Sequence, residues 1–311
     1  MPEPQNVLAP LTDSALFLTF VVRPGGEADV HALLPDVAGM IRSVGFPLPD
    51  EELTCVVGIG SDLWDRLFTG PRPARLHPFR EITGPRHRAP ATPGDLFVHL
   101  RARRPFTCFE LGRRIAGRLG AAADVVDEVT GFRYYDRRDL LGYVDGTENP
   151  TGAAAGAAAL VGADDPSFAG GSYLLVQKYV HDLARWTELP GADRDRAIGR
   201  HRADDVEIPD DLKAPDAHVA LATVEDADGT ERKIVRDNMP FGSIAKAEYG
   251  TYFAGYAADP GVIETMLTRM VVGVPPGTSD RILDVSTPVT GGLFFAPPAD
   301  FLAAPPPRPA G

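Results

Sequence analysis

The sequence predicts an α+β protein, and two observations support this. Short apolar runs with strand character alternate with segments whose apolar residues recur at helical spacing. In the first half of the chain, strands and helices follow one another in the order of a ferredoxin-like unit, and the second half repeats that rhythm loosely. We therefore expect mixed strands and helices around a core that 311 residues can amply fill.

The first half is expected to form one such unit. Strands are predicted at 16–22, 53–59, 95–101 and 125–135, and helices at 28–44, 61–68 and 109–119. The helix over 28–44 is drawn from the spacing of Val30, Leu33, Val37 and Ile41. Pro35 should bend or shorten its first turn, because proline removes a helical hydrogen bond. Segment 69–93 is dense in Pro, Arg and Gly and is expected to be a loop.

The second half is expected to repeat the pattern. Strands are predicted at 172–180, 218–224, 249–256 and 293–296, helices at 181–189 and 260–272, and a hairpin turn at 226–229 before a strand at 233–236. Segment 153–159, rich in Ala and Gly, should be flexible or weakly helical. The Pro-rich tail from 303 to 311 should be extended and mobile. A boundary in the loop before Gly142 divides the chain into domains 1–140 and 141–311.

Composition limits the possible partners and location. Lys plus Arg number 31 and Asp plus Glu 43, so 31 − 43 gives a net charge of −12. This acidity argues against nucleic acid and anionic membranes as partners. Cys55 and Cys108 lie in apolar contexts without metal-ligand spacing, which predicts free buried thiols in a reducing compartment. The apolar run 15–22 is too short to span a bilayer and no signal precedes it, so we expect a cytoplasmic protein.

The stretch from Gly142 to Pro150, with the sequence GYVDGTENP, is where chemistry is most concentrated. Asp145-Gly146 is a strong turn dipeptide, because glycine accepts positive φ without steric cost. With Gly142 on its other side, Asp145 has a backbone neighbourhood free of side chains, which lets a large flat ligand approach. Taken alone, the stretch also fits a hairpin turn with a solvated aspartate.

Two further motifs follow in order: His218, and then the block from Val235 to Gly242, VRDNMPFG. Together with Gly142-x-x-Asp145-Gly146, they resemble the signature of the dye-decolourising peroxidases, in particular the bacterial B-type branch. The resemblance runs from about residue 15 to 297. It implies tandem ferredoxin-like domains with antiparallel sheets and peripheral helices, and one haem b per subunit bound in the C-terminal half.

The resemblance makes His218 the ligand of the haem iron. Neutral imidazole is the commonest protein donor to such an iron. A ligating histidine usually donates its second N–H to a carboxylate, which makes the ring more basic. Asp280 and Asp284 are the candidates for that carboxylate, and the family's spacing favours Asp280. A solvated carboxylate at a helix start is the alternative for either.

The catalytic residues implied for the opposite face are Asp145, Arg236 and Asn238. Peroxide cleavage needs a base that moves a proton, a fixed positive charge and limited water. Asp145 suits the first task, Arg236 the second, and Asn238 can orient the peroxide. The alternatives are a surface salt bridge between Arg236 and Asp237, and a turn-capping role for Asn238.

Further cofactor contacts are implied around the macrocycle. Arg200 is the first candidate for a haem propionate, with Arg202 as a fallback. Gly146, Thr147 and Glu148 should pass near the ring edge because they follow Asp145. Phe253 is a candidate for the apolar wall, as is Phe295, although an aromatic on a strand is more often ordinary core.

The resemblance implies a haem peroxidase that reduces hydrogen peroxide while oxidising dyes, phenolics or similar one-electron donors. A haem carrier is the alternative, but it would need only His218 and an apolar slot. A haem-dechelating protein would use the same cavity. Homo-oligomers, hexamers in this branch, are also implied, and some relatives are packaged in encapsulin shells by a C-terminal tail. The tail here shows no clear docking sequence.

Overall fold

The computed structural model describes residues 2–309, and it confirms the α+β class. The first half contains β1 (Ser14–Val22), α1 (Glu27–Leu33), α2 (Val37–Gly45), β2 (Thr54–Gly60), α3 (Ser61–Leu67), β3 (Ile82–Thr83), β4 (Arg88–Ala89), β5 (Leu96–Ala102), α4 (Pro105–Leu119) and β6 (Ala123–Phe132). The second half contains α5 (Gly152–Ala159), β7 (Ser172–His181), α6 (Leu183–Glu188), α7 (Gly191–Ile198), α8 (His218–Ala222), β8 (Val224–Glu225), β9 (Glu231–Arg232), β10 (Val235–Arg236), β11 (Met239–Ser243), β12 (Glu248–Ala257), α9 (Pro260–Val272), β13 (Ser286–Pro288), β14 (Gly292–Ala296) and α10 (Ala299–Ala303).

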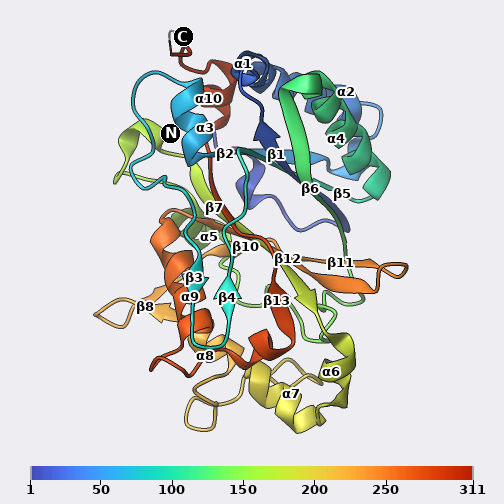
Figure 1. Ribbon diagram of the computed structural model, residues 1–311, viewed down its shortest axis with the longest axis vertical. Coiled ribbons are helices and arrows are strands. Elements are labelled where there is room, and N and C mark those ends of the chain that lie inside the picture. The colour runs from blue at the N-terminus through green and yellow to red at the C-terminus, as the bar shows by residue number, and fades with distance from the viewer. Residues whose placement is uncertain (1, 310–311) are drawn as a thin grey trace.

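Both halves show the antiparallel strand order of a ferredoxin-like unit. In the first half the neighbours are β2-β5-β1-β6, and in the second they are β10-β12-β7-β14, with β11 also on β12. In each half, the first and third main strands are central and the fourth lies beside the first. The edge strands β14 and β2 pair with each other, so the halves share one sheet. In Figure 1 most of the first half lies in the upper part and most of the second half in the lower part, although β3 and β4 reach down beside α9 and α10 lies at the top. The boundary near residue 140 stays a prediction.

The shared sheet folds so that the two halves pack face to face. Phe17 of β1 stacks on Tyr252 of β12 with ring centroids 4.2 Å apart, although several strands separate β1 and β12 in the sheet. Phe97 of β5 and Phe294 of β14 stack beside them at 5.3 Å. The outer face is covered by helices such as α4, which packs on β1 and β5. Because both faces are buried, β1 is apolar at nearly every position, with Thr19 interrupting the run, rather than alternating.

Some elements differ from their predicted form. The helix predicted over 28–44 is two helices, since the turn at Leu34–Asp36 that contains Pro35 separates α1 from α2 near its middle. The strand predicted at 218–224 is wrong: residues His218–Ala222 form the short helix α8. A short apolar run such as this one fits a strand or a buried helix equally well, and here it packs as a helix against α9.

The loop at 69–93 and the tail are also more ordered than predicted. The loop contains the small hairpin β3-β4, which lies beside α9. The carbonyls of Pro306 and Pro307 accept hydrogen bonds from His31 Nε2 and the Thr69 backbone, at 2.8 and 2.9 Å. These contacts hold the tail against the rest of the protein as far as Pro307. Residues 310 and 311 lie outside the described residues. Within residues 2–309 no helix combines the length and the apolarity needed to cross a membrane.

A buried ion pair joins the inner faces of the halves. Arg101 of β5 and Asp237, which follows β10, are 1% and 3% exposed. Arg101 Nη1 donates to Asp237 Oδ2 at 2.6 Å and to the Ala9 carbonyl at 3.1 Å. His99 lies 3.8 Å from the same carboxylate oxygen, and burial keeps the pKa of this histidine well below its usual value. The charge on Asp237 is therefore balanced by Arg101 and not by His99.

Removal of one member of this pair should destabilise the protein strongly. We expect Asp237→Leu or Arg101→Met alone to lower the free energy of unfolding by about 3–5 kcal/mol, because each leaves an uncompensated buried charge. The double variant should recover most of that loss, since two apolar side chains need no counter-charge. Urea unfolding measures all three. Arg113→Ala, which removes a surface pair with Glu110, is the control and should cost about 1 kcal/mol or less. If the double variant is as unstable as the sum of the single ones, the pair is not the reason for their effect.

Candidate active site

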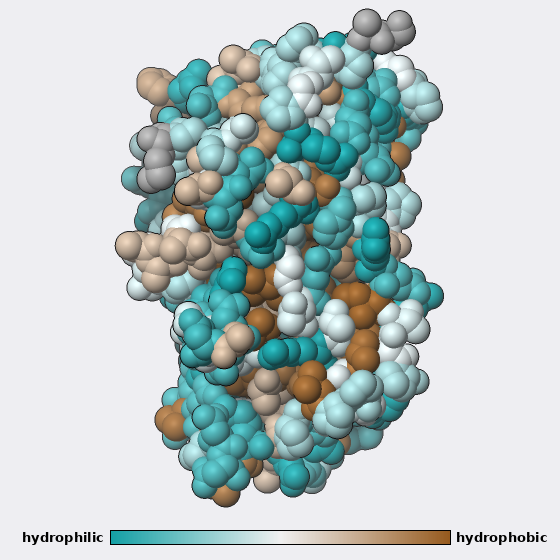
Figure 2. Space-filling model, turned by 90° about the vertical axis from the view of Figure 1, so that its left-hand side faces the viewer, coloured by the Kyte–Doolittle hydropathy of each residue, from teal (hydrophilic) through white to brown (hydrophobic). Residues whose placement is uncertain are grey.

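Nine of the ten predicted site residues line one large cavity in the second half of the chain. They are Asp145, Gly146, Thr147, Glu148, Arg200, His218, Arg236, Asn238 and Phe253. The space between protein atoms here is about 1380 Å³, including the part open to solvent. Figure 2 shows brown, hydrophobic atoms gathered in the middle and lower part of one face of the molecule, with teal atoms around them. The tenth residue, Asp280, is fully buried.

The loop that carries Asp145 is shaped by its glycines and held by Asn149. Gly142 and Gly146 have φ of +95° and +79°, a region that disfavours side chains. The backbone N–H of Asp145 donates to the Arg137 carbonyl at 2.9 Å. Asn149 then joins the loop to β10, because its Nδ2 donates to the Arg236 carbonyl at 2.7 Å and its Oδ1 accepts from the Arg236 N–H at 2.9 Å. The sequence analysis missed this role of Asn149.

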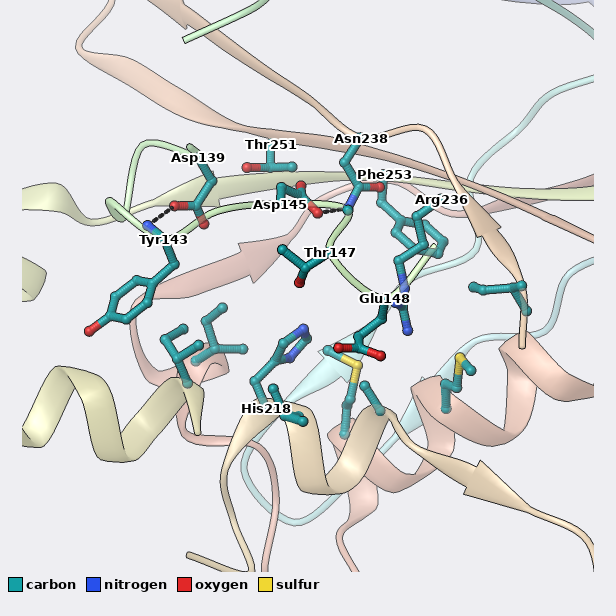
Figure 3. Close-up of a pocket in the computed structure, with 18 of the residues that line it drawn as sticks. Asp139, Tyr143, Asp145, Thr147, Glu148, His218, Arg236, Asn238, Thr251 and Phe253 are labelled. Carbon is teal, nitrogen blue, oxygen red and sulfur yellow. Dashed lines mark hydrogen bonds between the residues drawn. The ribbon is translucent and has the colours of Figure 1, made fainter. Parts of the chain in front are cut away.

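Asp145 and Asn238 are hydrogen-bonded to each other on one side of the cavity. Asn238 Nδ2 donates to Asp145 Oδ1 at 3.2 Å, as the dashed line in Figure 3 marks. Asn238 does not cap a turn, because its Oδ1 accepts no backbone N–H within residues 2–309. Asp145 Oδ2 has no hydrogen bond within the residues that the structure describes. The carbonyl oxygen Oδ1 of Asn238 is buried and finds no partner within residues 2–309, which is typical of an atom that faces a ligand or water.

Arg236 faces the same cavity, and the alternative of a salt bridge with Asp237 is wrong. In extended backbone, neighbouring side chains point to opposite faces. Asp237 therefore turns inward to Arg101, while Arg236 and Asn238 turn to the cavity. Within the described chain, no carboxylate forms an ion pair with Arg236. Burial lowers the pKa of Arg236, and Asp145 and Glu148 act against this; guanidinium nevertheless keeps its charge in proteins.

His218 approaches from the opposite side on α8, as Figure 3 shows. Its Nδ1 lies 2.8 Å from Asp280 Oδ2. Burial acts to lower the pKa of His218, but the charge and hydrogen bond of Asp280 outweigh it and raise the pKa. The side chain is 35% exposed, and this exposure is to the cavity that it lines. Asp280 also caps the turn Arg281–Asp284 by accepting from the Ile282 N–H at 2.9 Å, so its carboxylate is fixed on both oxygens.

The other carboxylate candidate, Asp284, has different partners. It lies 3.2 Å from Arg86 and 3.1 Å from His87. His181 also lines the cavity, and it bonds Thr251 at 3.0 Å and Ser286 at 2.7 Å through its two ring nitrogens. His218 is thus the cavity histidine whose second nitrogen, Nε2, has no hydrogen bond within the part of the chain that the structure describes.

Arg200 lies at the edge of the cavity among acidic side chains. It is 8% exposed and pairs with Glu148 and with Glu207, the latter at 3.0 Å. Its Nη1 also donates to the Asp205 carbonyl at 2.9 Å. Glu148 is bound by Lys233 as well, at 3.4 Å. A propionate at Arg200 would therefore share or replace these carboxylate partners, which keeps Arg200 a prediction for that role.

The apolar wall comes from α9 and β12. Met266, Leu267 and Met270 lie on one face of α9 and line the cavity with Phe253. Thioether and aromatic side chains adapt to a flat apolar ligand. Phe295 does not belong to this wall: it is fully buried in the main core, with Trp64 and Tyr173 at 5.8 and 5.0 Å.

The residues present fit a haem. One histidine offers a free ring nitrogen and has the carboxylate partner typical of metal-bound imidazole. A broad apolar wall suits a macrocycle. On the side facing His218, the orphaned Asn238 oxygen, Asp145 and Arg236 form a polar group that an empty apolar slot would not need.

Asp139 is a cavity residue that the sequence analysis missed. Burial raises the pKa of Asp139 to about 7, and the negative charge of Asp145 raises it further. The hydrogen bond that Asp139 accepts from the Tyr143 N–H, at 3.0 Å, acts in the opposite direction. Figure 3 places Asp139 above Tyr143 at the same edge as Asp145. Its only sequence signal is its position six residues before Asp145.

Comparisons with known proteins give matches along nearly the whole chain. Residues 4–133 match the family described as Dyp-type peroxidase, N-terminal, and residues 136–301 match Dyp-type peroxidase, C-terminal. The dye-decolorizing peroxidase of Mycobacterium tuberculosis is 56% identical over 98% of this chain and 91% of its own length. The encapsulated DyP-type peroxidase of Mycobacterium smegmatis superposes with a TM-score of 0.98 at 55% identity, over 99% of this chain and 100% of the other. A Rhodococcus jostii DypB variant in complex with heme gives 0.95 at 51% identity, over 97% and 98%.

The raised pKa of Asp139 should appear in the pH dependence of stability. A carboxyl whose pKa rises from 3.8 to about 7 on folding binds its proton more tightly in the folded state. Stability relative to Asp139→Asn should thus fall as pH rises from 4 to 7 and stay level above 8. Urea unfolding across this range measures the difference. Asp136→Asn, three residues earlier and exposed, should not reproduce the fall. Parallel curves for wild type and Asp139→Asn would show that Asp139 keeps an ordinary pKa.

Proposed function

The chain belongs to the Dyp-type peroxidase family and is a haem-dependent peroxidase, and we propose that His218 binds its iron while Asp145, Asn238 and Arg236 act on the peroxide. The observation that carries this assignment is that the three polar residues face His218 across one cavity. When bound, haem supplies the redox chemistry, taking two oxidising equivalents from peroxide and releasing them to two one-electron donors.

In this proposal Asp145 moves a proton. Its Oδ1 is held by Asn238, so Oδ2 takes the proton from one peroxide oxygen and returns it to the other, which leaves as water. Asn149 and the two glycines fix the loop, so the carboxylate is positioned before peroxide arrives. Such preorganisation is what makes a single carboxylate effective.

Arg236 supplies the fixed positive charge. Its guanidinium has no carboxylate partner within residues 2–309, so its field is available to charge that develops on the departing oxygen. Burial makes that field stronger than it would be in water. The apolar wall of α9 and Phe253 limits water around the same atoms.

On the other side, Asp280 makes the His218 ring a stronger electron donor. The buried carboxylate accepts from Nδ1 and fixes Nε2 as the nitrogen offered to iron. Arg200, Gly146, Thr147, Glu148 and Phe253 would contact the macrocycle and its propionates. A carrier would need His218 and the apolar wall but not the polar group opposite, so turnover is the function that accounts for all of these residues.

Peroxide and small reducing substrates are the partners of this activity. A cytoplasmic location is part of the proposal, supported by Cys55 and Cys108, which are free and whose pKa burial raises to about 12. Thiols held neutral in this way are inert. Homo-oligomers are proposed from the family resemblance. Packaging in a protein shell is proposed because one relative is described as encapsulated.

His218→Ala should abolish stable haem binding, because the iron loses its protein ligand. The haem content per chain, read from absorbance after reconstitution and gel filtration, measures this. His77→Ala, in an exposed loop, is the matched control and should keep full content. An unchanged resting spectrum and full haem content in His218→Ala would place the ligand elsewhere.

Asp145→Ala and Arg236→Leu should keep haem but react more slowly with peroxide. We expect a loss of roughly 10²–10⁴-fold for the proton-moving residue and roughly 10²–10³-fold for the fixed charge. Rapid mixing with peroxide, followed by absorbance, gives the second-order rate constant. Arg114→Leu on α4 controls for removal of an arginine. Wild-type rates in both variants would exclude these residues from peroxide cleavage.

A further inference from the structure

Asp139 is a second carboxyl in the cavity, and the peroxide chemistry described above gives it no task. It lines the same cavity as Asp145. Figure 3 shows both carboxyls on the side of the cavity that faces His218. A titratable group in this position can exchange protons with the groups that act on peroxide.

A small hairpin carries both carboxyls. The Asp139 N–H donates to the Tyr143 carbonyl at 2.8 Å, and the Asp145 N–H donates to the Arg137 carbonyl at 2.9 Å. A β-bridge at Arg138 lies between these two bonds. Because side chains alternate between the faces of extended backbone, Asp139 and Asp145 share one face and Arg138 lies on the other. Arg138 accordingly binds carbonyl groups and Asp136 rather than either cavity carboxyl.

The two carboxyls are close but have different partners. Diagonal positions in such a ladder are roughly 7–8 Å apart, a span that one water between the carboxyls can bridge. Asp145 Oδ1 accepts from Asn238 Nδ2 at 3.2 Å. Asp139 Oδ1 accepts the Tyr143 N–H at 3.0 Å, and no Lys, Arg or His within residues 2–309 forms an ion pair with it.

These surroundings favour a proton on Asp139 and a charge on Asp145. Burial raises the pKa of Asp139 to about 7, and the strongest charge acting on it is the negative one of Asp145. The titratable and charged groups that line the cavity from other elements are His181 on β7, Arg200 after α7, His218 on α8 and Arg236 on β10. Two carboxyls whose environments separate their pKa values in this way divide the roles of acid and base.

We propose that Asp139 is a positioning residue that hands protons to Asp145 after peroxide has been cleaved. The inference rests on the proposed function of Asp145. Cleavage takes up no net proton, because Asp145 moves one from the first peroxide oxygen to the other, which leaves as water. The remaining oxygen becomes water with two electrons from two reductants and two protons. For each electron, Asp145 gives a proton to that oxygen, Asp139 restores it, and Asp139 is reprotonated from solvent.

Infrared spectra of the resting holoenzyme test where the proton lies. The C=O stretch of a protonated carboxyl should disappear with a midpoint near pH 7 in wild type and should be missing in Asp139→Asn. In Asp145→Asn the midpoint should move to lower pH, because a neighbouring negative charge has gone. Asp136→Asn removes an exposed carboxylate three residues earlier and should leave the band unchanged.

Ferrocyanide tests the delivery of protons, because it gives an electron without a proton. In Asp139→Asn we expect the rate constant for reduction of the peroxide-treated holoenzyme by ferrocyanide to fall roughly 10²-fold. The rate constant for the reaction with peroxide, which takes up no net proton, should fall far less. In wild type the ferrocyanide rate should decline as pH rises through 7, since Asp139 loses its proton there. In the variant it should be low and level, and Asp136→Asn should follow wild type.

A carboxyl band that survives in Asp139→Asn would overturn the proposal, as would a wild-type ferrocyanide rate and pH profile in that variant. Equal losses in the peroxide and ferrocyanide rate constants would also overturn it, because they would show that Asp139 only supports the shape of the loop. If Asp145→Ala reacts with peroxide at the wild-type rate while Asp139→Asn still loses the ferrocyanide rate, the failure lies in the proposed function of Asp145 and not in Asp139.

Discussion

The active-site geometry depends on the burial of the Arg101–Asp237 ion pair between the two halves. An isolated carboxylate is costly in an apolar interior, so Asp237 must meet Arg101. Once it does, the alternation of extended backbone places Arg236 and Asn238 on the opposite side, toward the cavity. A slip by one residue would expose Asp237 to the cavity and bury Arg236 against Arg101. The buried charge of Asp237 therefore sets the register of the segment that carries Arg236 and Asn238.

The polar side chains on the two sides of the cavity differ in whether protein partners satisfy their hydrogen bonds. On the His218 side, a fully buried carboxylate is fixed by two hydrogen bonds and can only strengthen the imidazole as a donor. On the Asp145 side, the Arg236 guanidinium and one Asn238 oxygen are left without protein partners in the described chain. Unsatisfied groups are costly unless a ligand completes them. This asymmetry supports the proposal that one side of the cavity holds the iron ligand and the other side meets the substrate.

Loop geometry connects the halves of the site. Asn149 ties the Asp145 loop to the backbone of Arg236, so the positions of Asp145 and Arg236 are coupled. Gly142 performs a second task, because the lack of a Cβ lets Arg202 lie against the loop from outside. The loop from Gly142 to Pro150 therefore shapes the cavity on its inner side and, through Gly142, makes room for Arg202 on its outer side.

The sequence by itself determined the elements and the chemistry of the site. Long apolar periodicities fixed most strands and helices, and the spaced motifs at Asp145, His218 and Arg236 selected residues that the fold brings to one cavity. What only the tertiary structure decided depends on contacts between distant residues. His218 lies on a five-residue helix rather than a strand, because such a short apolar run adopts whichever form its neighbours leave open. The family's spacing favoured Asp280 over Asp284, but only the tertiary structure shows that Asp280 bonds His218 while Asp284 meets Arg86 and His87. The raised pKa of Asp139 and the Arg101–Asp237 pair depend on burial, which local sequence does not encode.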